Sequence, residues 1–263
     1  MKTIAIGSGK GGVGKSSVSA LIALALKRQG LSVGLLDADI FGPSIPHILG
    51  VVDGAVSEND LIQPIYVNGI ATLSVGNMCP TDAAIIWRGP LIHSVLDQMI
   101  NHTNWVDQSG KKLDYLIVDL PPGTGDVPIS LNQLTTLNGQ IIVCTPQKTA
   151  LIDAVRAVDM VKKIEKPMLG LIENMSYFLC DGCGKKHDIF GSGGVKQYAQ
   201  ANGLPFLGEV PFSPEIRKYE DSGSLFDLES NSDIMGIFDQ IAVNLVEQVK
   251  ANPVMPKLNM MQN

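Results

Sequence analysis

Short apolar runs recur along the chain and alternate with longer amphipathic stretches. The runs lack the apolar–polar alternation of half-exposed strands, and they are typical of strands buried on both faces of a parallel sheet. The strands predicted in this way are 2–7, Ser32–Asp37, Gly69–Val75, Leu113–Asp119, Gly139–Thr145, Met168–Glu173 and Pro205–Val210.

Helical patterns fill the intervals between these strands. The clearest is 149–163, where apolar residues recur at helical spacing. The predicted helices are 15–29, 90–101, 128–136, 149–163, 193–202 and 233–251. This alternation predicts an α/β fold with a doubly wound, mostly parallel sheet and helices on both faces. The carboxyl ends of the strands then share one edge, and the motifs described below fall at such ends.

Length and composition narrow the classes of protein. The 263 residues favour one domain over 1–251, followed by a loose tail at 252–263. A net charge of −6 disfavours broad electrostatic binding to nucleic acid. No apolar run approaches the ~18 residues of a membrane span, so we expect no membrane association. No signal peptide precedes the first strand, so we expect a cytoplasmic location.

The segment 9–16 directly follows the first predicted strand and matches the P-loop pattern G-x-x-x-x-G-K-[ST]. Its glycines let backbone N–H groups turn toward an anion, and the next helix directs its N-terminus to the same point. Lys15 can reach the β- and γ-phosphates of a nucleotide, and the Ser16 hydroxyl can ligate magnesium. The residues expected to bind the nucleotide here are Gly9, Gly11, Gly12, Val13, Gly14, Lys15, Ser16 and Ser17.

Lys10 occupies a position where an ordinary P-loop does not require a lysine. Because Lys15 already serves its own subunit's phosphates, Lys10 can reach a phosphate across a dimer interface. Its charge would then stabilise the transition state, as an arginine finger does. The alternative is a solvated lysine without a catalytic role.

Acidic residues end two of the predicted strands. Asp37 and Asp39 follow the second strand, and Asp39 lies further into the loop, so it is the better candidate to orient an attacking water. Asp37 can equally be a cap or turn residue. Asp119 ends an apolar strand in the Walker B form and is expected to reach the magnesium ion. The glycines Gly123 and Gly125 then make a loop that can respond to the γ-phosphate.

Two of the four cysteines form a C-x-x-C motif, Cys180 and Cys183. Two thiolates do not complete a tetrahedral site, so either His187 and another group join them or a second subunit supplies two more. A [4Fe–4S] cluster and a zinc ion both fit that count, and a redox dithiol is a third reading. Cys79 and Cys144 have no partner spacing, and Cys144 is expected to be a buried small hydrophobe.

Asn174 follows the strand Met168–Glu173 at the same expected edge. Its side-chain amide is both donor and acceptor, so it can pair with the polar edge of an adenine ring. A turn-forming asparagine is the alternative.

Together these residues resemble the Mrp/ApbC family of iron–sulfur cluster carrier ATPases, within the deviant Walker A group of P-loop proteins. The motifs that carry the resemblance are 9–16, Asp37-Ala38-Asp39 with Gly42-Pro43-Ser44, 119–126, Asn174-Met175-Ser176 and the cysteine pair. The P-loop alone also admits MinD- and ParA-like proteins, whereas Gly42-Pro43-Ser44 and the C-x-x-C motif narrow the choice. Many bacterial members carry an extra N-terminal domain, and here the P-loop strand begins at residue 2.

The resemblance implies a homodimeric ATPase that uses magnesium and passes its cluster to apo iron–sulfur proteins. It implies that Lys10 contacts the nucleotide across the dimer, and that Cys180 and Cys183 bridge one [4Fe–4S] cluster between two subunits. Asp39 is implied to orient water, Asp119 to be the Walker B residue and Asn174 to read adenine. A MinD/ParA-like positioning role would favour a basic amphipathic C-terminal helix, but Ile234–Val249 contains no lysine or arginine. A structural zinc ion in place of the cluster is the other alternative.

Overall fold

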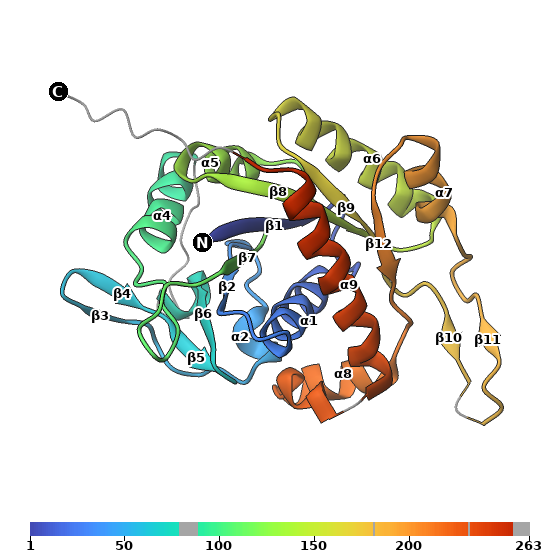
Figure 1. The fold of residues 1–263 in the computed structure, drawn as a ribbon, viewed down its shortest axis with the longest axis horizontal. Helices are drawn as coiled ribbons and strands as arrows, with labels where there is room; N and C mark the ends of the chain where they lie inside the picture. Colours follow the sequence, from blue (N-terminus) through green and yellow to red (C-terminus); the bar gives the residue numbers. More distant parts are fainter. Residues whose placement is uncertain (79–88, 181, 231, 255–263) are drawn as a thin grey trace.

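The computed structural model describes residues 1–78, 89–180, 182–230 and 232–254. An eight-stranded sheet crosses the molecule in the order β12-β9-β8-β1-β7-β2-β6-β5 (Figure 1). Its strands are β1 (Lys2–Ser8), β2 (Val33–Asp37), β5 (Ile65–Val67), β6 (Ile70–Ser74), β7 (Tyr115–Asp119), β8 (Leu137–Cys144), β9 (Met168–Glu173) and β12 (Phe206–Glu209). Neighbouring strands are parallel except for β5, which is antiparallel to β6. The predicted doubly wound, mostly parallel sheet is confirmed.

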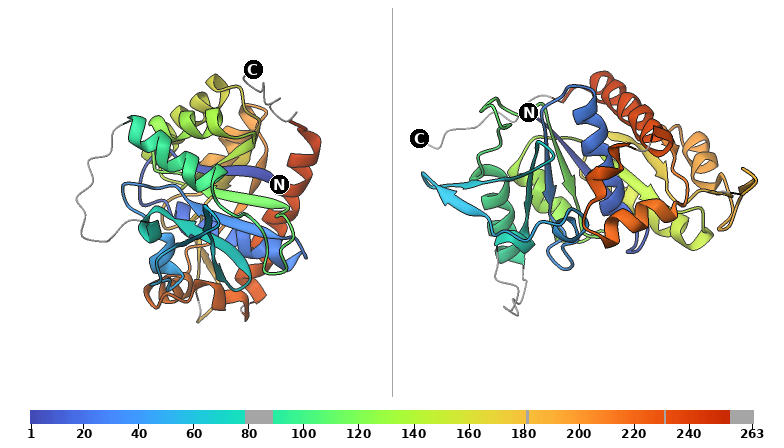
Figure 2. Two further views of the ribbon diagram at one scale, coloured as in Figure 1. Left: turned by 90° about the vertical axis from the view of Figure 1, so that its left-hand side faces the viewer. Right: turned by 90° about the horizontal axis from the view of Figure 1, so that it is seen from below.

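Helices cover both faces of the sheet (Figures 1 and 2). The helices on one face are α1 (Lys15–Arg28) and α9 (Ser232–Ala251), and those on the other are α4 (Gly89–Asn101), α5 (Asp126–Leu134), α6 (Lys148–Lys163) and α7 (Gly194–Ala201). Successive strand side chains alternate between the two cores, as the pleat requires. Ile4 packs in the core under α1 and α9, whereas Ala5 packs in the core under α4 and α5. Every helix predicted from the sequence is present.

Several short elements were not predicted from the sequence. They are the helices α2 (Ile45–Ile48), α3 (Val75–Met78) and α8 (Pro214–Asp221), the 3₁₀ helix η1 (Leu225–Ser230), the antiparallel edge strand β5, and the strands β3 (Val56–Glu58), β4 (Leu61–Gln63), β10 (Phe178–Leu179) and β11 (Lys186–His187). Apart from α8 and η1, these elements have two to four residues and are too short to show a period. The β3–β4 and β10–β11 hairpins project from opposite ends of the sheet (Figure 2).

The strand ends that carry the motifs meet at one edge because the central strands are parallel and in register. Ile6 of β1 and Asp37 of β2 both lie opposite Asp119 of β7. The loop after β1, the loop after β2 and the end of β7 therefore converge, as expected. Residues 255–263 of the predicted tail, and Cys79, lie outside the described residues.

The C-terminal helix α9 uses its apolar face inside the molecule. Phe238, Ile241 and Leu245 are at most 1% exposed and belong to the core that contains α1. This packing leaves that face unavailable for docking elsewhere. Among the described helices, none is both long enough and apolar enough to cross a bilayer.

The Leu245→Ala substitution is expected to lower the free energy of unfolding by about 2–5 kcal/mol, because it opens a cavity in the core under α9. The matched control is Val243→Ala on the same helix, where the side chain is 40% exposed and the expected change is within about 0.5 kcal/mol. Urea unfolding of both variants measures the difference. Similar losses in the two would contradict this assignment of the core face.

Candidate nucleotide-binding site and cysteine hairpin

The loop between β1 and α1 has a backbone that only glycine accommodates at several positions. Gly12 and Gly14 both have φ of 76°, in the left-handed region. A Cβ on Gly9 would collide with the backbone of Asp153 in α6, and one on Gly14 would collide with the Asn174 amide. The glycine spacing is therefore required by the conformation of the loop and by the close approach of two neighbouring elements.

Asp119 is the electrostatic centre of the site. Its fully buried carboxylate accepts hydrogen bonds from Lys15 Nζ at 2.8 Å, Ser16 Oγ at 2.6 Å and Ser19 Oγ at 2.6 Å. Lys15 is itself only 7% exposed. A buried charge is stable only when it is paired and hydrogen-bonded, and each of these donors meets that need.

The oxygen atoms at this point suit a magnesium ion. Ser16 Oγ and Asp119 Oδ2 are hard ligands that lie 2.6 Å apart beside the glycine loop. Magnesium prefers oxygen ligands and is commonly held by one or two protein groups together with phosphates and water. The donor set therefore fits the ion that the sequence predicted here.

The two aspartates after β2 have different environments. Asp37 is fully buried, and it accepts hydrogen bonds from the backbone N–H groups of Asp39 and Ile45 and from the Ser74 hydroxyl. Burial, together with the nearby charge of Asp119, raises the pKa of Asp37 to about 7. The hydrogen bonds that Asp37 accepts hold the loop after β2 in shape.

Asp39, by contrast, lies at the cavity and remains partly accessible. Its carboxylate lies 4.0 Å from Lys15 Nζ. Burial raises the pKa of Asp39, and the positive charge of Lys15 opposes that rise. Of the two aspartates, only Asp39 lines the cavity around the P-loop.

That cavity, which we call the phosphate cavity, has a volume of about 290 Å³. Its lining residues are Ser8, Lys10, Gly11–Ser17, Asp39, Ser44, Ile48, Pro122 and Glu220. Lys10 Nζ donates a hydrogen bond to Gln147 Oε1 at 3.4 Å, just before the first residue of α6. Lys10 thus lies at the rim, while Lys15 lies at the floor.

A second cavity of about 340 Å³, which we call the apolar cavity, adjoins the first. The residues shared by the two linings are Gly12, Gly14, Ser17 and Glu220. Its remaining walls are mostly apolar and come from α1, α8, α9 and the segment 210–213. Asn174 also lines it, with its Nδ2 donating to the Val13 carbonyl at 2.8 Å. The side chain of Asn174 therefore lies against the P-loop at the mouth of an apolar cavity.

Three residues at this site were missed from the sequence: Glu173, Phe212 and Glu220. Glu173 is fully buried at the end of β9, where it accepts from the Ser176 hydroxyl at 2.6 Å and from Val195 N at 2.9 Å. An acid at the end of an apolar strand was a visible signal, the same one that singled out Asp119. Phe212 and Glu220 carried no such signal, because only the tertiary fold brings them to the P-loop.

Cys180 and Cys183 lie at the tip of the β10–β11 hairpin. Cys180 N donates to Lys185 O at 3.0 Å, and Gly184 N donates back to Cys180 O at 2.7 Å, which closes the turn. Cys183 is exposed and Cys180 is partly exposed. A redox C-x-x-C motif opens a helix, whereas this one connects two strands.

Within the described ranges, no group of three or more histidine, cysteine, aspartate or glutamate side chains is arranged to hold a metal ion. His187 pairs with Phe178 across the hairpin and does not complete a site with the two thiols. Cys144 is 1% exposed in β8, and burial raises the pKa of its thiol to about 12. Cys144 is therefore the buried small hydrophobe that was predicted.

Aromatic rings connect the apolar cavity to the base of the cysteine hairpin. The Phe212 ring lines that cavity and lies edge-on to Phe178 and to Phe190, each at 6.5 Å between ring centroids. Phe212 N also donates to Tyr177 O at 2.7 Å. The same residue therefore touches the nucleotide-binding edge and the segment that carries Cys180.

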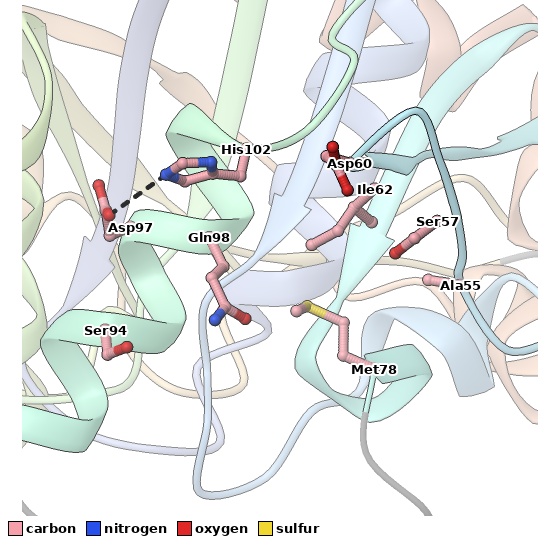
Figure 3. Close-up of a pocket in the computed structure, with 9 residues that line it drawn as sticks. All are labelled: Ala55, Ser57, Asp60, Ile62, Met78, Ser94, Asp97, Gln98 and His102. Atoms are coloured by element: carbon pink, nitrogen blue, oxygen red, sulfur yellow. Dashed lines mark ion pairs between the residues drawn. The ribbon is translucent and has the colours of Figure 1, made fainter.

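A further cavity of about 450 Å³ lies between the β3–β4 hairpin and α4 (Figure 3). Its polar side chains include Asp60, Gln98 and the ion pair between Asp97 and His102, whose nearest atoms are 3.6 Å apart. None of the site residues predicted from the sequence lines it. The residues expected from the motifs lie at the P-loop and at the β10–β11 hairpin, and not here.

The chain is similar to known proteins over most of its length. Residues 1–246 match the family model described as NUBPL iron-transfer P-loop NTPase. The iron-sulfur cluster carrier protein of Deinococcus radiodurans is 48% identical over 223 residues, which are 84% of this chain and 62% of that protein. The protein of the same name from Escherichia coli K12 is 42% identical, over 94% of this chain and 66% of its own length. The chain thus spans less than two thirds of these relatives.

Solved structures show the same fold. A nucleotide-binding protein from Archaeoglobus fulgidus, determined in complex with ADP, is 33% identical with a TM-score of 0.75, over 89% of this chain and 90% of its own. The cell division ATPase MinD from Pyrococcus furiosus has a TM-score of 0.67 at 21% identity, over 94% and 98% of the two chains. At that identity the MinD likeness concerns the fold alone.

The Asp119→Asn substitution is expected to lower the free energy of unfolding of the nucleotide-free protein by about 3 kcal/mol. The reason is that Lys15 would remain buried without an opposite charge. Urea unfolding measures the loss, with Asp221→Asn as the control because its ion pair with Arg217 is exposed and contributes little. An equal response of the two variants would contradict the central place given to Asp119.

Proposed function

The chain belongs to the NUBPL iron-transfer family of P-loop NTPases, and on that premise we propose that it is a homodimeric ATPase that carries a [4Fe–4S] cluster to apo-proteins. One observation carries the proposal. A cavity lined by the P-loop, with Lys10 among its lining residues, and a C-x-x-C hairpin with Cys183 exposed near its tip occur in one chain. Relatives named iron-sulfur cluster carrier protein support an iron–sulfur cluster as the cargo.

The phosphate cavity is proposed to bind ATP. Lys15 exchanges its contact with Asp119 for the β- and γ-phosphates, and the backbone N–H groups of 11–16 surround the same oxygens. Ser16 and Asp119 would hold magnesium, which neutralises charge on the phosphates. Asp39, at the cavity wall, is proposed to orient the attacking water. Its partial accessibility is compatible with that role, unlike the burial of Asp37.

The second subunit is proposed to meet the first along the edge that carries the P-loop. Large apolar side chains on the loop after β2 and at the N-terminal ends of the neighbouring helices are exposed there: Phe41, Leu91, Ile129 and Ile152, between 41% and 66%. Exposed apolar side chains around a polar site favour a protein interface. Closure of this edge brings Lys10, already at the cavity rim, toward the partner's phosphates, where its charge stabilises the transition state.

The two cysteine hairpins are proposed to share one cluster. Two thiolates from each copy supply the four ligands of a [4Fe–4S] cluster, which a two-fold axis makes geometrically simple. The exposure of the hairpin tip leaves each thiolate open to exchange with a client's thiols. Such exchange is what a carrier requires and a permanent site does not.

Anaerobic reconstitution with iron and sulfide tests this function. The wild-type protein is expected to give a brown chromophore in a species that contains two subunits per cluster, measured by visible absorption and size-exclusion chromatography. Cys180→Ala and Cys183→Ala are each expected to lose the chromophore. Cys144→Ala is the matched control, because this thiol is buried in β8 and should not change cluster loading.

Three outcomes would contradict the proposal. A colourless protein with one zinc ion per dimer would support a structural zinc site in its place. A protein that stays monomeric with iron, sulfide and nucleotide would remove the shared site. Loss of the chromophore in the Cys144 control as well would mean that the hairpin is not the cluster site.

Nucleotide and cluster are proposed to be linked through Phe212, whose ring contacts both the apolar cavity and the hairpin base. Wild-type protein is expected to pass its cluster to a chelator at a rate that ATP changes about fivefold or more, in the range of ordinary coupling energies. In Phe212→Ala this ATP effect should fall below about twofold, while loading is retained. Ile189→Ala, an exposed position near the hairpin, serves as the control and should keep the wild-type effect. An unchanged ATP effect in Phe212→Ala would exclude this route.

A further inference from the structure

Glu220 lies where the phosphate cavity and the apolar cavity meet. It lines both, together with Gly12, Gly14 and Ser17. It comes from α8, a short helix that no sequence motif singled out. Because the two cavities share a boundary, a ligand that fills both must cross this boundary, beside the Glu220 carboxylate.

The Glu220 carboxylate has hydrogen-bonding capacity that the described residues leave unused. Glu220 Oε1 is buried and has no hydrogen-bond partner in the described structure. Burial raises the pKa of Glu220, and a hydrogen bond with the Ser17 side chain opposes that rise. A buried acceptor without a donor costs free energy, and a ligand hydroxyl that supplies the donor would recover it.

The order of groups in a nucleoside triphosphate identifies this donor. The P-loop fixes the phosphates in one cavity, and the apolar walls with Asn174 suit a base in the other. The sugar joins the two and therefore crosses the boundary. Its 2′- and 3′-hydroxyl groups are hydrogen-bond donors. The phosphates carry only acceptors, and the base lies beyond the boundary between the two cavities, so the sugar is the part that can donate to Glu220.

We propose that Glu220 recognises a ribose hydroxyl of the bound nucleotide and makes the site selective for ribonucleotides over their deoxy analogues. The inference rests on the proposed ATP binding and adds a residue that sets specificity. Ser17 positions the carboxylate from the P-loop side. Because Glu220 Oε1 is buried, a deoxy analogue would leave this acceptor unpaired, and the penalty increases the discrimination between the two nucleotides.

Binding of ATP, 2′-deoxy-ATP and 3′-deoxy-ATP to the nucleotide-free protein tests the proposal by calorimetry. The wild-type protein should bind one of the two deoxy analogues about tenfold more weakly than ATP, the loss expected for one unpaired buried group. In Glu220→Ala the ratio should fall below about twofold. Glu220→Gln keeps a carbonyl acceptor and should give an intermediate ratio.

The matched control is Asp221→Asn, which removes one negative charge from the adjacent position of α8. Its side chain is exposed and paired with Arg217, so the wild-type ratio should persist. If Glu220→Ala weakens the binding of all three nucleotides equally, Glu220 has a structural role. If Glu220→Ala strengthens the binding of all three nucleotides equally, the Glu220 carboxylate repels the phosphates. Either result overturns the inference.

The proposed function fails separately. If the wild-type protein binds none of the three nucleotides, the ATP site itself is wrong and the inference falls with it. If the wild-type protein binds all three with equal affinity, ATP binding stands and only the assignment of Glu220 is wrong. The unfolding midpoint of each variant without nucleotide shows that the compared proteins are folded.

Discussion

A single carboxylate buried at the end of a central strand determines how this site is built. Asp119 has no access to solvent, so its charge depends on donors from the P-loop and α1. Those donors stay in place because β1 and β7 are paired in register, and the pairing continues past the strand ends. Leu120 N donates to Ile6 O and Gly123 N donates to Ser8 O. The P-loop and the loop after Asp119 are therefore held to each other. A phosphate that draws Lys15 away from Asp119 would alter the interactions of both loops.

Buried acids recur at the ends of three strands, and each serves a different purpose. Asp119 binds Lys15 and Ser16, which line the phosphate cavity. Asp37 accepts backbone N–H groups and shapes the loop that presents Asp39. Glu173 binds Ser176 and the first turn of α7, which fixes the turn between β9 and the hairpin. The arrangement explains how a rigid sheet edge supports both a nucleotide site and a projecting hairpin without a separate domain for either.

The sequence predicted the sheet, its helices and the P-loop because these depend on local patterns that are long enough to read. Apolar runs identify buried strands without reference to the rest of the chain. The hairpin strands β10 and β11 have two residues each and no readable period. The part of Glu220 and Phe212 in the site could not be predicted from the sequence for a different reason. Both lie more than 190 residues from the P-loop, and only the packing of α8 and 210–213 against α1 makes them part of the site.

The small size of the β10–β11 hairpin, with two residues in each strand, suits the proposed carrier role. An isolated hairpin of this length is unstable in water, so its position depends on side chains at its base. These include the edge-on contact of Phe178 with Phe212 and the Lys186 ammonium 3.9 Å above the Tyr177 ring. Because Phe212 also lines the apolar cavity, the proposed coupling has a nucleotide in this cavity alter the support of the cysteines. If that coupling holds, linkage requires the reverse effect: a cluster bound at the hairpin must change the affinity for nucleotide by the same factor. In the proposed carrier, a small change at the firmly supported nucleotide site would therefore release the cluster from the weakly supported hairpin beside it.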